Sequence, residues 1–213
     1  MNALIEQIAP PFAMKFARKL KAVVAPTKNS LFDGDDQAFK ALASEAKVYG
    51  EYGCGASTRW VAGETEATIL AVDTAKVWID SVRADVDSRK SVSLKWVDLG
   101  PLADWGRPIG YTRSDRFHEY TEWLWQQTQK PDLVLVDGRF RVCCFATSLK
   151  HAAADTTIIF DDYTNRPQYH IVEALLPFSS TCGRQAIFKV PSRANLDLAK
   201  VDEMITNFRF VID

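Results

Sequence analysis

The sequence predicts an α/β fold built on a doubly wound, mostly parallel sheet of seven strands that ends in a C-terminal antiparallel hairpin. Several apolar runs are continuous rather than alternating, as in parallel strands whose two faces are both buried. Segments with helical spacing of their apolar residues separate these runs. Two β-prone runs near the C-terminus flank Gly183-Arg184, and a two-residue connection that contains glycine signals a hairpin.

The order of these patterns gives the expected elements. Parallel strands are expected over 47–52, 68–73, 92–97, 131–139 and 156–163, and hairpin strands over 178–182 and 185–190. Helices are expected over 35–46, from 57 onward, and over 75–87, 115–127, 141–152, 171–176 and 195–207, with Ser114 as an N-cap. The last apolar run, 208–212, is interpreted as an added edge strand or a partner contact.

A long irregular segment, 99–113, is rich in glycine and proline. Loops of this length inside a compact domain are usually functional. One interpretation is that the loop covers a bound nucleoside or gates the substrate, with Trp105 as a stacking side chain. The other is that it is a surface excursion anchored by the hydrophobic side chain of Trp105.

The composition is that of a globular protein. The chain has 213 residues, of which 47% are hydrophobic and 25% charged. Its net charge of −1 argues against a nucleic-acid binder held by a basic surface, and no apolar run approaches the length of a transmembrane helix. The four cysteines match neither a metal-ligand spacing nor a disulfide scaffold. A reducing, cytoplasmic location is therefore expected, with Cys143 and Cys144 as buried free thiols.

Three parts are predicted along the chain: an N-terminal helical arm over 1–46, a ligand-binding core over 47–190, and a C-terminal helix and strand extension over 191–213. Within the arm, basic and apolar side chains interleave over 12–23 as in an amphipathic helix. Such a helix binds a membrane surface or a partner, or it covers the domain or lines the contact of a homodimer. The second interpretation is favoured.

The best-defined candidate site follows the first strand, in the run from Glu51 to Thr58. Gly53 and Gly55 let the chain turn sharply and let a ligand lie against the main chain. Ser57 and Thr58 open the next helix, whose N-terminus faces the turn. Thr58 stands where a dinucleotide-binding turn has its third glycine. With Glu51 at the strand end, the turn suits a charged nucleoside better than a pyrophosphate.

Two further acids end the next strands. Asp73 follows the glycine turn at close to the ~20-residue spacing at which βαβ nucleotide sites place their ribose-binding carboxylate. Its two oxygens can accept hydrogen bonds from both ribose hydroxyls. The alternative is an ordinary exposed acid at a strand end. Asp98 ends the third strand in the same way.

Three more acids, Asp137, Asp161 and Asp162, follow the fourth and fifth strands. Ligands of a doubly wound sheet bind outside the carboxyl ends of its strands, and these two strands are expected to be neighbours. Carboxylates that converge repel one another unless protons or a cation offset their charge. A hard divalent ion such as Mg²⁺, which prefers oxygen ligands, fits such a site.

The run E-x-G-x-G followed by Ser-Thr resembles motif I of the class I S-adenosylmethionine-dependent methyltransferases, and the spacing to Asp73 agrees. The resemblance covers roughly 47–190 and implies that S-adenosylmethionine is the cofactor. Asp98 stands where the family often carries a residue that meets the adenine. The implied cofactor-binding residues are Glu51, Gly53, Gly55, Ser57, Thr58, Asp73, Asp98 and Asp137.

V-D-G at 136–138 and D-D-Y at 161–163 are similar to the metal site of cation-dependent O-methyltransferases, of the catechol type and, more closely, of the macrolide-sugar type. The resemblance implies Mg²⁺ held by Asp137, Asp161 and Asp162, and a hydroxyl acceptor on a small molecule or sugar. In such enzymes the ion lowers the pKa of the hydroxyl and orients its oxygen. Catechol-type enzymes have asparagine where Asp162 stands, so its ligand role is the least secure.

The predicted function is methyl transfer from S-adenosylmethionine to a hydroxyl oxygen, with Asp137 and His170 as candidate catalytic residues. His170 is either a base that removes the proton of the hydroxyl or a surface residue in the first turn of a helix. Besides a membrane- or partner-directed module built on the N-terminal helix, two other functions stay open. One is a binding protein that keeps the fold without catalysis, and the other is an NAD-dependent oxidoreductase, against which Thr58 and the hairpin argue.

Overall fold

The structure, a computed structural model, describes residues 31–32, 35–86, 88 and 90–213. Residues Phe32–Asp213 form one compact unit. The amphipathic helix predicted over 12–23 lies outside the described residues. The division of the chain at 46 and 190 stays a prediction. In the described part of the chain, no helix is long and apolar enough to cross a membrane.

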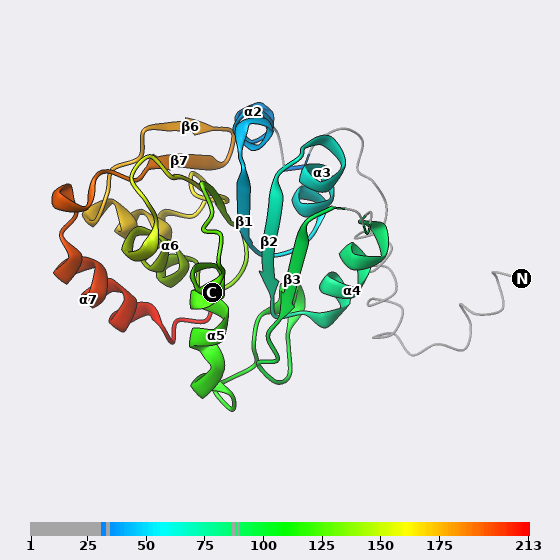
Figure 1. Ribbon diagram of the computed structural model, residues 1–213. Coiled ribbons are helices and arrows are strands. Elements are labelled where there is room, and N and C mark those ends of the chain that lie inside the picture. The colour runs from blue at the N-terminus through cyan, green and yellow to red at the C-terminus, as the bar shows by residue number, and fades with distance from the viewer. Residues whose placement is uncertain (1–30, 33–34, 87, 89) are drawn as a thin grey trace, which may run out of the picture. The chain divides into compact units, whose positions relative to one another are not determined.

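A seven-stranded sheet runs through this unit in the order β3-β2-β1-β4-β5-β7-β6 (Figure 1). Strands β1 to β5 pair in parallel, and β7 pairs antiparallel with both β5 and β6. The strands are β1 Val48–Tyr52, β2 Thr68–Asp73, β3 Val92–Trp96, β4 Leu133–Val136, β5 Thr157–Phe160, β6 Ser180–Cys182 and β7 Gln185–Lys189. This arrangement confirms the predicted sheet, including its C-terminal hairpin.

Helices cover both faces of the sheet (Figure 1). One layer contains α2 Gln37–Glu45, α3 Ala56–Glu64 and α4 Lys76–Asp85, and the other contains α5 Phe117–Gln126, α6 Arg141–His151 and α7 Leu198–Phe208. Short 3-10 helices are η1 Asp104–Gly106, η2 Ser114–Arg116, η3 Pro167–Ala174 and η4 Arg193–Asn195. The two faces of strand β1 contact different layers. The Tyr49 ring contacts Phe39 of α2, whereas the Tyr52 hydroxyl forms a hydrogen bond with α5.

The central strands are apolar along their whole length because helices bury both of their faces. Every residue of β4 and β5 is buried, as the continuous apolar runs predicted. The polar end of Tyr52, inside the core, has two hydrogen-bond partners. The Tyr52 hydroxyl donates to the Thr121 carbonyl oxygen at 2.6 Å and accepts from Trp125 Nε1 at 2.9 Å.

All four cysteines lie in the described part of the chain and are free thiols. Cys54, Cys143 and Cys144 are buried, which confirms the prediction for the adjacent pair, and Cys182 is partly exposed. Burial raises the pKa of the Cys143 thiol to about 11. The buried thiols are therefore poor nucleophiles.

Two predicted helices differ from the structure. The helix expected from 115 begins as the 3-10 helix η2, so α5 starts at Phe117 and Ser114 is not its N-cap. The segment expected to be a helix over 171–176 belongs to the 3-10 helix η3, which starts earlier, at Pro167. Proline fixes a helical φ and fits the first turn of a helix.

The residues after α7 do not form the edge strand expected over 208–212. Instead α7 continues to Phe208, and the Val211 N–H donates to the Phe208 carbonyl oxygen at 3.0 Å in a turn. The Phe210 ring then contacts the Phe117 ring, with centroids 6.2 Å apart, and Asp213 reaches the start of α6. Because these contacts hold the tail against α5 and α6, it pairs with neither edge of the sheet.

The turns after β1 and β4 touch each other through two glycines. Gly53 has a φ of 108°, a conformation that glycine adopts without strain. A Cβ on Gly138 would lie 1.9 Å from the Tyr120 hydroxyl oxygen and 2.8 Å from the Gly53 nitrogen. The two turns therefore pack at a distance that leaves no room for a side chain at position 138.

Gly138→Ala should destabilise the protein, because the added methyl group meets main-chain atoms that have no room to move. Overpacking of this kind costs about 1–3 kcal/mol, and we expect a loss of that size in the free energy of unfolding measured by urea denaturation. Gly63→Ala is the matched control, since nothing lies within 4 Å of a Cβ there and alanine favours the helix. Equal stability of Gly138→Ala and the unaltered protein would contradict the close packing.

Candidate functional site

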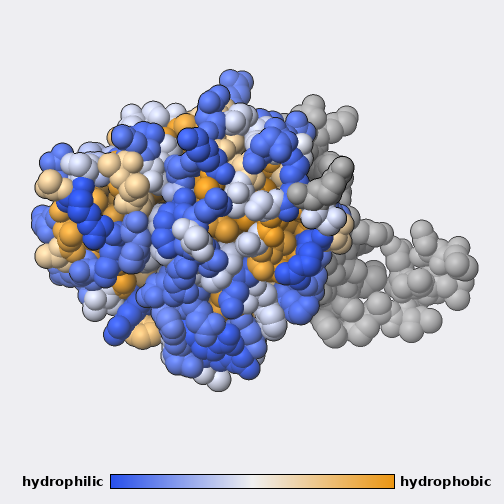
Figure 2. Space-filling view, in the orientation of Figure 1, coloured by the Kyte–Doolittle hydropathy of each residue, from blue (hydrophilic) through white to orange (hydrophobic). Residues whose placement is uncertain are grey.

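Polar residues gather at one edge of the sheet, where β1, β2, β4 and β5 end. Parallel pairing brings these ends together, because Tyr52 of β1 pairs with Val72 of β2 and with Val136 of β4, and Val136 pairs with Phe160 of β5. Mostly hydrophilic residues cover the end of the molecule toward which β2 and β3 run, in the lower part of Figure 2. The edge therefore suits a polar ligand.

Glu51 is a buried carboxylate at the end of β1, only 1% exposed. Its Oε2 accepts from Thr58 Oγ1 at 2.6 Å, and its Oε1 accepts a short hydrogen bond from Ser57 Oγ. Thr58 Oγ1 in turn accepts from the Gly55 N–H at 2.9 Å. Loss of hydration raises the pKa of Glu51 to about 7, although the two hydroxyls stabilise its charged form. The predicted residues of the turn are thus brought together in one network.

Asp73 lies beside this network at the end of β2 and is half-buried. Its Oδ1 accepts from the Ala75 N–H at 2.7 Å. Burial raises the pKa of Asp73 to about 7, while the Ala75 N–H and the Arg139 guanidinium favour its charged form. Glu51 and Asp73 also repel each other. A cationic group bound near them would favour the charged form of both.

The 99–113 loop lies over the end of β2. Thr74 Oγ1 donates to the Gly106 carbonyl oxygen at 2.5 Å, and a Cβ placed on Gly106 would be 3.6 Å from Asp73 Oδ1. Trp105 is 69% exposed, so it does not anchor the loop in the core. Its role in stacking on a nucleoside stays a prediction.

Asp98 lies directly before this loop, after the end of β3. Its Oδ1 accepts from the Gly100 N–H at 3.0 Å, its Oδ2 pairs with Arg113, and its carbonyl oxygen accepts from Arg116 Nη1 at 3.0 Å. These contacts fix the path of the loop as it leaves β3. The predicted contact of Asp98 with adenine stays a prediction.

Asp137, Asp161 and Asp162 converge as the sequence predicted, with ligand atoms that all lie within 4.8 Å of one another. They differ in accessibility, since the side chains of Asp161, Asp162 and Asp137 are 0%, 9% and 29% exposed. Distance alone would suit a metal ion. Whether these residues fit an ion also depends on the partners of their carboxylates.

Arginines occupy the carboxylate oxygens. Arg184 donates from Nε and Nη2 to the two oxygens of Asp161, at 3.0 and 2.6 Å. Arg166 Nη2 lies 2.8 Å from Asp162 Oδ2. Sequence reasoning missed both partners. Arg184 lies 23 residues after Asp161, in the hairpin, and Arg166, although only four residues after Asp162, reaches it through a turn whose path no local pattern fixes.

Arg141, the first residue of α6, is the third partner and is only 3% exposed. Its Nη2 donates to Asp137 Oδ1 at 3.0 Å, and its Nη1 lies 3.3 Å from Asp162 Oδ2. The Asp–Arg cluster, as we call it, consists of Asp137, Asp161, Asp162, Arg141, Arg166 and Arg184. These residues do not fit Mg²⁺, because permanently charged guanidinium groups already bind both oxygens of Asp161 and Asp162 and one oxygen of Asp137.

His170 lies in η3 and is exposed. Its Nε2 is 3.0 Å from the Tyr163 carbonyl oxygen, and its ring stacks on the Tyr163 ring with centroids 4.6 Å apart. A carbonyl oxygen only accepts, so Nε2 carries the proton. A base role would fall to Nδ1 and stays a prediction.

Asp213 also lies at this edge, a placement that sequence reasoning missed. Arg139 Nη1 donates to its main-chain oxygen, and its carboxylate oxygens are 3.3 Å from the Arg141 N–H at the start of α6. A carboxylate is favourable at a helix N-terminus. The tail after α7 thus forms part of the wall around the ends of β1 and β4.

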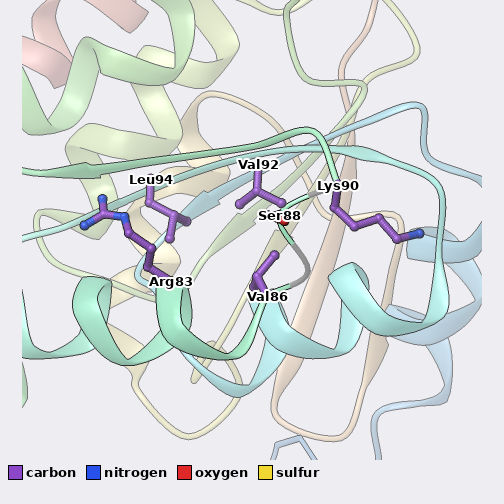
Figure 3. Close-up of a pocket in the computed structure, with 6 residues that line it drawn as sticks. All are labelled: Arg83, Val86, Ser88, Lys90, Val92 and Leu94. Carbon is purple, nitrogen blue, oxygen red and sulfur yellow. The ribbon is translucent and has the colours of Figure 1, made fainter.

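A surface hollow of about 380 Å³ lies elsewhere, between α4 and β3. In Figure 3 Val92 and Leu94 stand above the end of α4, with the cationic side chains of Arg83 and Lys90 on either side. The lining residues are Arg83, Val86, Ser88, Lys90, Val92 and Leu94. Because Val92 begins β3, the hollow lies toward the amino end of the strand, away from the candidate site.

No protein-family model and no curated protein matches this chain. Among solved structures, a methyltransferase-like protein from Silicibacter pomeroyi DSS-3 is 31% identical, with a TM-score of 0.68. The match covers 79% of this chain and 92% of that protein. With this identity and coverage, that protein is a relative of this chain.

Two more distant structures share the fold. A TehB-like SAM-dependent methyltransferase from Corynebacterium glutamicum is 14% identical with a TM-score of 0.52, over 85% of this chain and 100% of its own. The N-methyltransferase NodS from Bradyrhizobium japonicum, in complex with S-adenosyl-L-homocysteine, is 14% identical with a TM-score of 0.50, over 82% and 98%. At such identity the likeness concerns the fold alone.

Glu51→Gln should stabilise the ligand-free protein at neutral and higher pH. Folding raises the pKa of Glu51 from 4.5 to about 7, so stability is lost as pH rises between these values, because the unfolded chain ionises first. Glutamine does not ionise, so the variant avoids this loss of stability at high pH. We expect the free energy of unfolding to increase by about 1–3 kcal/mol at about pH 8 and to change little at about pH 4.

Urea denaturation at both pH values measures the effect. Asp80→Asn is the control, because Asp80 lies on α4 with a side chain 47% exposed, and the same change there should have little effect. A Glu51→Gln protein that is less stable than the unaltered protein at high pH would contradict the prediction.

Proposed function

The chain belongs to the class I S-adenosylmethionine-dependent methyltransferase family, and we propose that it transfers a methyl group from S-adenosylmethionine to a hydroxyl oxygen of a small molecule or sugar. The observation that carries the proposal is the network after β1, where Glu51 ties the glycine turn to α3. Asp73 lies near it at the end of β2, where it interacts electrostatically with Glu51. Family membership weighs against an NAD-dependent oxidoreductase.

The residues at the ends of β1 and β2 fit this cofactor. Apart from its chain neighbours, none of the described residues has an atom within 4 Å of a Cβ on Gly55, so among them that side of the turn is open to a ligand. Gly53 and Gly55 would let the cofactor lie against the main chain at the N-terminus of α3. Asp73 would accept from the ribose hydroxyls, and Glu51 would face the cationic methionine part. Ser57 and Thr58 hold that carboxylate in place.

When bound, the cofactor supplies an electrophilic methyl group. The protein orients the acceptor oxygen and removes its proton. Asp137 is the better placed of the two candidate bases, because it is partly exposed and follows β4, the neighbour of β1. Arg141 bonds one oxygen of Asp137 and so fixes its direction. His170 has one ring nitrogen committed to a carbonyl oxygen.

Mg²⁺ assistance is left out of this proposal, because the Asp–Arg cluster does not fit the ion. The second candidate function is a methyltransferase-like binding protein without turnover. The position of Asp213 favours it, since the tail lies beside Arg139 and α6, next to where an acceptor would approach Asp137. The cytoplasmic location and the homodimer stay predictions.

Calorimetric titration with S-adenosylmethionine tests the cofactor. We expect binding to the unaltered protein, and Asp73→Asn should weaken it by roughly 10-fold to 100-fold, because a hydrogen bond to a charged group contributes about 1.5–3 kcal/mol. Asp80→Asn makes the same charge change on the exposed side of α4 and should leave affinity unchanged. NAD serves as the ligand control. Failure to bind both S-adenosylmethionine and S-adenosylhomocysteine would reject the proposal.

Formation of S-adenosylhomocysteine in the presence of hydroxylated or amino acceptors tests the transfer. We expect turnover with hydroxylated acceptors, and Asp137→Asn should lower kcat by about 10²-fold to 10⁴-fold, as expected for loss of a general base. Affinity for S-adenosylmethionine should stay within a few-fold of normal. Intact cofactor binding with no turnover on any acceptor would favour the non-catalytic function instead.

A further inference from the structure

The Asp–Arg cluster lies where two neighbouring strands end. Asp137 follows β4, and Asp161 and Asp162 follow β5, and the last residues of these strands, Val136 and Phe160, pair in parallel. Three carboxylates with oxygens within 4.8 Å of one another repel unless positive charge offsets them. The protein itself supplies that charge.

Arg184 supplies part of it from the turn between β6 and β7. Its guanidinium meets Asp161 as a fork, with Nε 3.0 Å from Oδ1 and Nη2 2.6 Å from Oδ2. Gln185 Nε2 also donates to Oδ1 of Asp161 at 3.1 Å. Such bidentate pairs are strong and directional. Because Asp161 is fully buried, both of its oxygens are committed to the protein.

Asp162 is held from two sides. Arg166 Nη2 lies 2.8 Å and Arg141 Nη1 3.3 Å from its Oδ2, and Arg184 Nε lies 3.4 Å from its Oδ1. Its φ of 58° is an unfavourable conformation for a residue with a side chain. Such a conformation persists only when the surroundings fix it. The arginines therefore determine where this carboxylate points.

Arg141 lies at the centre of the cluster. Besides Asp137, it donates from Nε to the Gly138 carbonyl oxygen at 3.0 Å and from Nη1 to the Asp161 carbonyl oxygen at 2.7 Å. Its side chain is 3% exposed. A buried guanidinium bonded through all three nitrogens has no path by which to make room for an ion.

We infer that the guanidinium groups of Arg141, Arg166 and Arg184 take the place of a divalent cation, so that the cluster binds no metal and Arg141 positions Asp137. Among the described residues of the cluster, three acids face three arginines, which offset the carboxylate charge without an ion. A cation would meet bonded oxygens and nearby charges of its own sign. The metal-free state does not depend on the proposed function, whereas the positioning of Asp137 for catalysis rests on it.

Mn²⁺ binding to the full chain tests the inference, because bound Mn²⁺ loses the sharp electron paramagnetic resonance signal of the free ion. We expect the unaltered protein to leave the signal unchanged at millimolar Mn²⁺. Arg166→Ala/Arg184→Ala keeps the three carboxylates and removes two of their three counter-charges. This variant should take up one Mn²⁺ per chain, and adding Asp161→Asn should abolish the uptake.

The matched control is Arg83→Ala/Arg193→Ala, which removes the same charge from α4 and η4 and should bind no Mn²⁺. Circular dichroism checks that each variant is folded. If the double variant does not fold, Arg184→Ala replaces it, because this single change removes the arginine from both oxygens of Asp161. That single variant should also gain Mn²⁺ binding.

Two results would overturn the inference. One is stoichiometric Mn²⁺ uptake by the unaltered protein that Asp161→Asn abolishes. The other is a folded arginine variant, double or single as above, that takes up no Mn²⁺. The assay contains neither cofactor nor acceptor, so its failure is distinguishable from failure of the S-adenosylmethionine titration.

Discussion

The buried carboxylate of Glu51 is the interaction on which the candidate site depends. Both of its oxygens are bonded to the first turn of α3, so strand, glycine turn and helix are fixed as one unit before a ligand arrives. Burial opposes the charge of this group and raises its pKa to about 7. The protein therefore keeps a group that weakens the ligand-free fold at the place where a ligand would bind, a common relation between stability and function.

The acids after β4 and β5 also carry carboxylate charge at this edge of the sheet, but arginines rather than hydroxyl groups stabilise it. Guanidinium groups surround them, and one of these, that of Arg184, comes from the antiparallel hairpin. The hairpin is thus more than an addition to the sheet, because it neutralises Asp161 at the end of β5. Asp213, held by Arg139 and the start of α6, extends this pattern of paired charges to the tail.

The sequence was sufficient for features that depend on local pattern or general topology. The sequence placed Glu51, Ser57 and Thr58 around one turn, although the hydrogen bonds between them appear only in the structure. The convergence of Asp137 with Asp161 follows from the rule that parallel strands end at one edge. The arginine partners were not predicted. Arg184 comes from a distant hairpin, and the contacts of Arg141 and Arg166, each four residues after its aspartate, depend on the path of the turn between them. The run 208–212 looks like a strand, but packing of Phe210 against α5 decides its conformation.

The four thiols differ in solvent exposure, which has a practical consequence for spectroscopy. Only thiolates react readily with maleimides, and Cys182 is the one cysteine of the chain that is not buried. It stands in the same hairpin as Arg184, with its sulfur 3.8 Å from the Asp35 carbonyl oxygen. A fluorophore can therefore be attached beside the Asp–Arg cluster without replacing any cysteine. Its emission would report on movement of the hairpin relative to the rest of the sheet.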